Sequence, residues 1–147
     1  MSLLFYNSTS GLAQFYNTDG QGGINQVWST TFSKGWTHIV PGAFVLDFGP
    51  RALFFYNSTS GLGQFYSTDS IGGMHQLSST TYSTGWTHIV DVPVAQGPGI
   101  VDDDLLFYKG TSGLAQFYHT DRQGNINQLS NTTYSTGWTL IEWLEIL

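Results

Sequence analysis

The sequence predicts an all-β protein built from three four-stranded, blade-like repeats. Three observations indicate this. The same stretch of sequence occurs three times, at residues 3–40, 53–90 and 105–142, and residues 41–52 and 91–104 are predicted to be linkers between the copies. Residues that favour strands (Thr, Tyr, Phe, Ile and Val) are frequent in each copy. Clusters of Gly, Ser, Asn and Asp recur about every 8 to 12 residues, which is the usual spacing of turns in an all-β chain.

Four strands are predicted in the first copy, and turn-forming residues separate them. The strands are residues 3–6, 12–17, 24–31 and 36–40. The turns are residues 7–11, 19–23 and 33–35. Because the other two copies repeat this pattern, about twelve strands are expected in total. Residues 138–147 are expected to form the last strand and a tail, by analogy with their two counterparts.

Two architectures accommodate three copies of a four-stranded unit: a β-propeller, in which each copy is one blade, and a single-chain β-trefoil. Residues 53–56 and 105–108 favour the propeller, because they are apolar at nearly every position. Such strands are buried on both faces, as an inner strand between two neighbouring blades would be. The barrel strands of a trefoil would instead alternate apolar and polar residues. The β-trefoil remains the alternative.

Three blades are too few to close a ring, since propellers contain about four to eight. Open ends would also expose long apolar edges, which promote aggregation. Two chains related by a two-fold axis, the commonest symmetry of oligomers, would give a closed ring of six blades. The sequence therefore predicts that residues 1–147 form a single domain that assembles as a homodimer.

The repeated motif resembles a known family. The first copy reads LLFY-x-x-x-S-G-x-x-QFY-x-TD, then G-x-I-x-Q, and finally GW-x-x-IVPG-x-F. This unit resembles the tandem blades of bacterial FG-GAP-like propeller proteins and, more loosely, those of tachylectin-2-type lectins. The resemblance implies a propeller fold. The acidic calcium loop common in FG-GAP blades is not intact here, because Asp102, Asp103 and Asp104 lack the alternating order of a liganding loop.

The composition excludes several classes of function. Lys and Arg total 4 against 10 Asp and Glu, so the chain cannot build the basic surface that nucleic acids require. The absence of cysteine excludes disulfides, thiol catalysis and zinc–thiolate sites. No apolar run approaches the roughly 20 residues of a membrane span. Residues 1–6 do not resemble a secretion signal, and the cellular compartment is left unassigned.

No catalytic constellation is recognisable, so the protein is not expected to be an enzyme and no cofactor is predicted. His38 and His88 share a repeat position, but Leu140 occupies it in the third copy. The acidic run at residues 102–104 is expected to be a solvated loop. Consecutive residues of an extended segment point to alternate faces and do not converge on one ion, so no metal site is predicted.

The recurring aromatic and polar residues predict a binding function. A sugar is recognised by a flat aromatic ring against its C–H face, with neutral or acidic hydrogen-bonding groups at the rim. Every copy supplies both kinds of group, and the low charge suits a neutral ligand. The candidate ligand-binding residues are Trp36, Trp86, Trp138, Asp19, Asp69, Asp121, Gln21 and Gln123. Further recurring residues nearby in sequence are Gln14, Gln64, Gln116, Gln26, Gln76, Gln128, Tyr16, Tyr66 and Tyr118.

The same residues also have a structural interpretation. A Trp after Gly at a strand start often packs between blades, and an Asp before a turn often accepts hydrogen bonds from the turn amides. Two hypotheses follow. The first is a non-catalytic, multivalent carbohydrate-binding protein whose partners are glycans and a second copy of the chain. The alternative is a structural or protein-interaction propeller module without a small-molecule ligand, in which repeat identity reflects folding, recent amplification or a reconstruction of the repeat.

Overall fold

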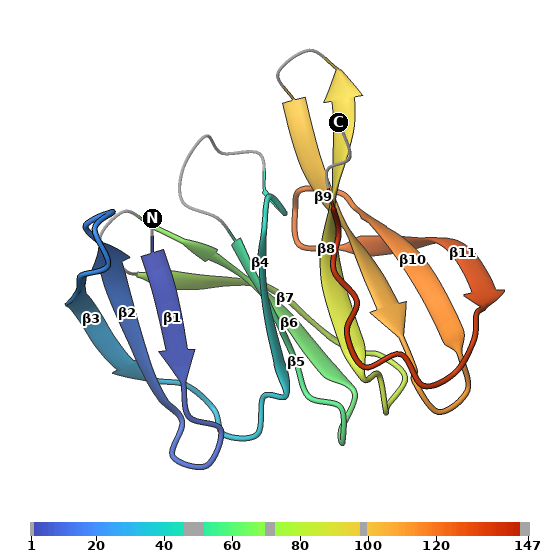
Figure 1. The fold of residues 1–147 in the computed structure, drawn as a ribbon, viewed down its shortest axis with the longest axis horizontal. Coiled ribbons are helices and arrows are strands. Elements are labelled where there is room, and N and C mark those ends of the chain that lie inside the picture. The colour runs from blue at the N-terminus through green and yellow to red at the C-terminus, as the bar shows by residue number, and fades with distance from the viewer. Residues whose placement is uncertain (1, 46–51, 70–72, 98–99, 145–147) are drawn as a thin grey trace. The chain divides into compact units, whose positions relative to one another are not determined.

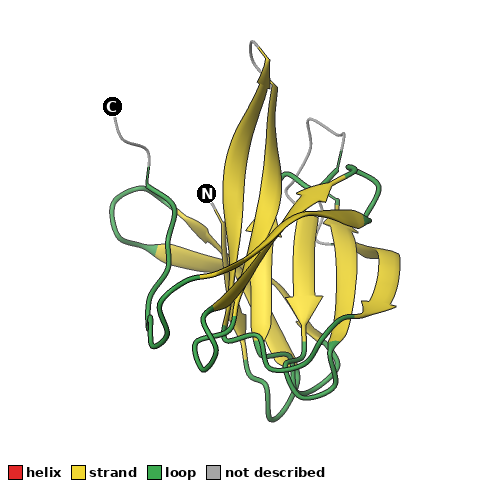
Figure 2. Ribbon diagram, turned by 90° about the vertical axis from the view of Figure 1, so that its right-hand side faces the viewer, coloured by secondary structure: helices red, strands yellow, loops and turns green. Residues whose placement is uncertain are grey.

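The computed structural model describes residues 2–45, 52–69, 73–97 and 100–144. These residues form strands and loops and contain no helix (Figure 2). The predicted all-β fold class is therefore confirmed. In particular, no helix of the described part is long and apolar enough to cross a membrane. The chain forms two compact units, Met1–Thr37 and His38–Leu147.

The first unit is a three-stranded antiparallel sheet with the order β1-β2-β3 (Figure 1). Its strands are β1 (Ser2–Tyr6), β2 (Leu12–Thr18) and β3 (Ile24–Thr31). Asn7 starts the turn between β1 and β2, and its Oδ1 accepts hydrogen bonds from the N–H groups of Thr9 and Ser10, both at 3.0 Å. Gly11 ends this turn with φ +80°, and a Cβ there would lie 2.3 Å from the Phe32 carbonyl oxygen. Only glycine fits this position.

The second unit contains two four-stranded antiparallel sheets. The first is ordered β4 (His38–Gly42), β5 (Ala52–Tyr56), β6 (Leu62–Thr68) and β7 (Met74–Thr81). The second is ordered β8 (His88–Gly97), β9 (Ile100–Tyr108), β10 (Leu114–Thr120) and β11 (Ile126–Thr133). The described residues form no closed barrel, which the β-trefoil alternative would require.

The sheets are shifted by one strand relative to the sequence copies. β4 belongs to the first copy but pairs with β5 of the second, with His38 opposite Tyr56. In the same way β8 belongs to the second copy and pairs with β9 of the third, with His88 opposite Tyr108. The prediction that each copy forms its own four-stranded blade is therefore wrong. Each four-stranded sheet takes its first strand from the preceding copy.

The two segments between copies also differ from expectation. Residues 91–104, which the sequence predicts to be a linker, extend β8 and β9 into a long hairpin, of which residues 98 and 99 lie outside the described part. The other linker, residues 41–52, contributes to β4 and β5 at its ends. Residues 46–51 of this linker lie outside the described residues.

Eleven strands are described, instead of the roughly twelve expected from the turn spacing. Residues 138–144 are the counterpart of β4 and β8, but they form no strand, and residues 145–147 lie outside the described part (Figure 1). β4 and β8 each hydrogen-bond to the first strand of the next copy. Residues 138–144 have no such strand beside them in the described structure, which explains why the strand prediction is wrong there.

The two sheets of the second unit pack over an aromatic core. The ring centroid of Phe107, from β9, lies 5.8 Å from that of Phe54 in β5 and 5.7 Å from that of Trp86. All three side chains are at most 2% exposed. Each such side chain contributes about 1.5–3 kcal/mol through burial. Every position of β5 is buried, which confirms that this apolar strand is covered on both faces.

Candidate binding site

The three recurring tryptophans differ in exposure. Trp36 and Trp86 are 6% and 2% exposed, whereas Trp138 is 55% exposed. The Trp86 ring lies edge-on against Phe107, and the Lys109 ammonium lies 5.4 Å from its ring centroid. Rings covered in this way present no face to a sugar, so Trp36 and Trp86 act in packing. Of the three, Trp138 keeps an open ring surface.

Asp19, the first of the recurring aspartates, organises the turn between β2 and β3. Its Oδ1 accepts hydrogen bonds from the backbone N–H groups of Gln21 at 2.8 Å and of Gly23 at 2.9 Å. These two bonds, that from Gln21 foremost, lower the pKa of Asp19 because they stabilise the carboxylate. A Cβ at Gly23 would lie 2.2 Å from Asp19 Oδ2, so the turn closes tightly on the carboxylate.

Asp69 and Asp121 repeat this arrangement in the other copies. Asp69 Oδ1 accepts a hydrogen bond from the Gly73 N–H at 2.6 Å, across residues 70–72, which lie outside the described part. Asp121 Oδ1 accepts from the N–H groups of Gln123 at 2.8 Å and Asn125 at 3.0 Å. Desolvation raises the pKa of Asp121, but hydrogen bonds from Asn125 and Gln123 outweigh it and lower the pKa overall.

Gln21 and Gln123 therefore meet these aspartates through their backbone rather than through their side chains. Both side chains are exposed next to the turn. Gln123 also forms an isolated antiparallel bridge with Val45. The turn interpretation of the aspartates thus holds in each copy, and it leaves the two glutamine side chains directed to solvent at the hairpin tips.

A polar cluster on each hairpin brings a tyrosine and glutamines together, and we call it the Gln–Tyr–Gln cluster. In the first unit it consists of Gln14, Tyr16 and Gln26. The Tyr16 hydroxyl lies 3.1 Å from Gln14 Oε1 and 3.3 Å from Gln26 Oε1, so these two acceptors share its single O–H donor. Gln14 Nε2 donates to Gln26 Oε1 at 3.2 Å. Gln14 and Gln26 each combine an acceptor with amide donors on the accessible side of the sheet.

The second unit contains the same cluster. The Tyr66 hydroxyl lies 3.0 Å from Gln64 Oε1 and 3.1 Å from Gln76 Oε1. In the third copy Tyr118 donates to Gln116 Oε1 at 2.8 Å, with Gln128 directly opposite Tyr118 on β11. Burial raises the pKa of both tyrosines, so the two hydroxyls stay protonated and act as donors at neutral pH.

The sequence signal for this cluster is the Gln-x-Tyr spacing, because residues two apart in a strand share a face. The second glutamine is aligned by a β-bulge that recurs in each hairpin, between Phe15 and Tyr16 in the first copy. Each tyrosine ring packs edge-on against a phenylalanine of the neighbouring strand. The ring-centroid distances are 5.1 Å for Phe5–Tyr16, 5.2 Å for Phe55–Tyr66 and 5.0 Å for Phe107–Tyr118.

The acidic run of residues 102–104 is buried. Asp102, Asp103 and Asp104 lie on β9 and are 6%, 3% and 5% exposed, so the expectation of a solvated loop is wrong. The physical reason is that the linker continues the sheet. The three carboxylates do not converge, and no cluster of three or more potential metal ligands occurs among the described residues.

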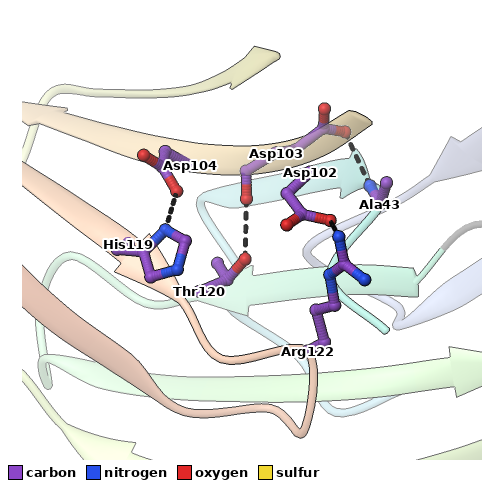
Figure 3. A network of polar contacts seen from close by, with 7 residues as sticks. All are labelled: Ala43, Asp102, Asp103, Asp104, His119, Thr120 and Arg122. Carbon is purple, nitrogen blue, oxygen red and sulfur yellow. Dashed lines mark hydrogen bonds and ion pairs between the residues drawn. The ribbon is translucent and has the colours of Figure 1, made fainter. Parts of the chain in front are cut away.

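Each of these aspartates makes a different contact (Figure 3). The side-chain contacts are Asp102 Oδ1 with Arg122, Asp103 Oδ2 with the Ala43 N–H at 2.6 Å, and Asp104 Oδ1 with His119 Nδ1 at 2.7 Å. Arg122 reaches its partner from a backbone with φ +61°. The contact with Ala43 ties β9 to the segment that follows β4. Asp103 therefore links the two sheets, whereas Asp102 and Asp104 bind partners within the hairpin of β10 and β11, and each buried carboxylate has the partner that it requires.

His38 and His88 lie on neighbouring first strands of the two sheets in the second unit. His38 Nε2 lies 3.0 Å from the carbonyl oxygen of Thr87, and His88 Nδ1 lies 2.9 Å from Thr87 Oγ1. Burial lowers the pKa of His38, the hydrogen bond to the Thr87 carbonyl opposes this, and the nearby His88 lowers it further. Both imidazoles are thus held by a single threonine.

No protein-family model matches the chain, and no curated protein is significantly similar to it. The chemistry of the recurring groups is then the guide to function. Each hairpin carries an Asp-capped turn at its tip. The Gln–Tyr–Gln cluster lies on the two paired strands of the same hairpin. Amides, phenols and a carboxylate, with few cations nearby, suit a neutral ligand rich in hydroxyl groups.

Proposed function

We propose that the protein is a non-catalytic, multivalent carbohydrate-binding protein. Each binding site consists of one Gln–Tyr–Gln cluster and the neighbouring Asp-capped turn. The observation that carries this proposal is that all three hairpins keep a tyrosine–glutamine hydrogen bond on a partly exposed face. A carboxamide both donates and accepts, as a sugar hydroxyl does, so a pair of glutamines matches two adjacent hydroxyls.

The assembly we propose for these sites is a six-bladed propeller made of two chains. Antiparallel four-stranded sheets that pack face to face, as in the second unit, resemble blades. Two chains carry six copies of the hairpin. Identical weak sites on one ring act together on a multivalent glycan surface, where avidity exceeds the affinity of each site.

The buried tryptophans favour a second candidate function. Trp36 and Trp86 recur but are covered, so the conservation of this position between copies serves packing. If the same holds for the polar cluster, the protein is a structural or protein-interaction propeller module without a small-molecule ligand. The two candidates differ in whether the tyrosine hydroxyls at the Gln–Tyr–Gln clusters contribute to ligand binding.

The test is a glycan array probed at high protein density, with the triple variant Y16F/Y66F/Y118F beside the unmodified chain. The phenylalanines keep the edge-on packing and remove only the hydroxyls. We expect the unmodified chain to bind a neutral glycan and the triple variant to lose roughly tenfold or more in affinity, about 1.4 kcal/mol. Lys34→Met is the control, because Lys34 is exposed and lies outside the clusters.

Absence of binding above background by the unmodified chain would overturn the carbohydrate proposal and favour the interaction module. Equal binding by the triple variant and the unmodified chain would overturn the assignment of the site to the clusters. Far-ultraviolet circular dichroism and thermal unfolding of each variant separate a loss of binding from a loss of fold.

A further inference from the structure

Residues 138–144 are the third copy of a strand that is paired in both earlier copies. β4 joins the edge of β5 with His38 opposite Tyr56, and β8 joins the edge of β9 with His88 opposite Tyr108. In both cases the strand that ends one copy adds, antiparallel, to the strand that begins the next. Residues 138–144 are described but lie in no sheet.

β1 presents the matching open edge. It is the counterpart of β5 and β9, but it is the outermost strand of its sheet and pairs only with β2 in the described structure. Leu3 and Phe5 on this strand are 40% and 52% exposed. The residues at the Phe5 position in the other copies, Phe55 and Phe107, are 1% and 0% exposed. At the position of Phe5, the second unit shows a ring that the neighbouring sheet covers, since Phe107 packs against Phe54.

The end of the third copy also exposes large apolar side chains. Trp138, Leu140 and Trp143 are 55%, 71% and 48% exposed, whereas Trp86, at the Trp138 position, is 2% exposed. An apolar hollow also lies against β9 and β10. Its lining includes Leu106, Phe117, Tyr134, Trp138 and Leu140. Two of these, Leu106 and Phe117, are the counterparts of Phe54 and Phe65, which are buried in the core of the second unit.

We propose that residues 140–144 of one chain add to β1 of a second copy as an antiparallel fourth strand, and that the second copy donates the same strand in return. The register follows from the two internal examples. The expected opposed pairs are Leu140–Tyr6, Ile141–Phe5, Glu142–Leu4, Trp143–Leu3 and Leu144–Ser2. Trp138 then packs edge-on against Phe5 of the other chain, as Trp86 packs against Phe107 within one chain.

The partner that covers β1 and the apolar hollow is a second copy of the chain, because the chain carries both halves of one interface. One half is the hollow beside Leu106 and Phe117, whose counterparts Phe54 and Phe65 belong to the core cluster in which Phe54 meets Phe107. The other half is the exposed face with Phe5, the counterpart of Phe107. Two chains satisfy both halves twice around a two-fold axis, which leaves no open end. The inference rests on the two-chain assembly in the proposed function, but not on glycan binding.

Glu142 is one of the positions at which the third copy departs from the other two. Val40 and Val90 occupy this position in β4 and β8, and Val40 is 6% exposed. A carboxylate opposite Leu4 at the joint weakens the association, because burial of an unpaired charge is unfavourable. We therefore expect Glu142→Val to lower the concentration at which two chains dissociate by roughly tenfold, which corresponds to about 1.4 kcal/mol.

The experiment joins the two strands covalently. The chain has no cysteine, so a double variant Phe5→Cys with Ile141→Cys contains only the two introduced thiols. Directly opposed residues of antiparallel strands lie close enough for a disulfide. We expect mild oxidation to give a covalent species of twice the 16.2 kDa chain mass on a non-reducing gel, and light scattering of the unmodified chain to give the same doubled mass.

The matched control is Phe5→Cys with Glu142→Cys. A one-residue change of register places the second thiol on the opposite face of the strand, so no cross-link is expected. A second control, Leu129→Asp, changes an exposed apolar residue outside the joint and leaves the doubled mass unchanged. Phe5→Asp is expected to reduce the mass to that of one chain.

A single-chain mass for the unmodified protein would overturn the proposal, and so would a cross-link confined to one chain. A dimer that fails to cross-link through Phe5→Cys and Ile141→Cys would overturn strand exchange as its cause. These outcomes are separable from glycan binding. A monomer that binds glycans overturns only the joint, whereas a cross-linked dimer that binds none overturns only the proposed function.

Discussion

The Tyr108 hydroxyl donates a 2.6 Å hydrogen bond to the carbonyl oxygen of Ser135, 27 residues further along the chain. The same bond, with the same length and sequence separation, joins Tyr56 to Ser83. It closes each copy by tying its first strand to the turn after its third. Tyr56 and Tyr108 are 0% and 1% exposed, so these bonds lie at the edge of the core.

Removal of this hydroxyl is expected to destabilise the second unit. Tyr56→Phe keeps the ring but leaves the Ser83 carbonyl without this donor, which lowers the free energy of unfolding by about 1–2 kcal/mol. Urea unfolding followed by tryptophan fluorescence measures the change. Tyr134→Phe, at an exposed position, should leave the midpoint unchanged, and equal midpoints for both variants would contradict the proposed role of the bond.

Phe107→Ala and Phe5→Ala test the same repeat position in two environments. Phe107 is 0% exposed and contacts Phe54, Trp86 and Tyr118, so its truncation should cost about 3–5 kcal/mol. Phe5 is 52% exposed, so at low protein concentration the same change should cost about 1 kcal/mol or less. Denaturant unfolding of both variants gives the comparison, and similar costs would show that the core is not where these contacts place it.

Removal of Arg122 should leave a buried charge unpaired. Asp102 is 6% exposed and its carboxylate contacts the Arg122 guanidinium, so Arg122→Met is expected to destabilise the second unit by about 3–5 kcal/mol. Adding Asp102→Asn should recover part of this loss of stability, because it removes the unpaired negative charge. Lys34→Met serves as the exposed control. A double variant no more stable than Arg122→Met alone would argue against the ion pair as the cause.

His38 should make stability depend on pH. Burial lowers the pKa of His38 below its usual value in the folded state, so the unfolded chain binds a proton more readily. Stability contributed by the neutral imidazole is therefore present above the unfolded pKa, about 6.5, and is lost as the pH falls below it. His38→Leu introduces the residue that the third copy has at this position. This variant should lose less of its unfolding free energy than the unmodified chain as the pH falls from about 7 to 5. Thermal unfolding across this range, with the exposed His75→Gln as control, measures the slope.

The strands, turns and repeat unit could be predicted because their causes are local. Alternating and apolar residues predict β2 and β5, Asn7 caps a turn through its own side chain, and Asp19 accepts from amides two and four residues away. The Gln-x-Tyr spacing likewise places two side chains of the cluster on one face. The Asp-capped turn and the Gln-x-Tyr pair recur in every copy because they depend on residues within a single hairpin, whereas the Asn cap recurs only at Asn57, since Lys109 takes that position in the third copy.

Other features depend on pairing between distant strands, and the tertiary structure alone determined them. Local sequence shows that residues 36–40 favour a strand, but not that β4 pairs with the next copy, and therefore not that residues 138–144 are left without a partner. Burial of Asp102, Asp103 and Asp104 follows from the extension of β9 and from contacts with Ala43, Arg122 and His119. Strand propensity is set by each residue and its neighbours, whereas ladder partners and burial are set by which surfaces meet after the chain has folded.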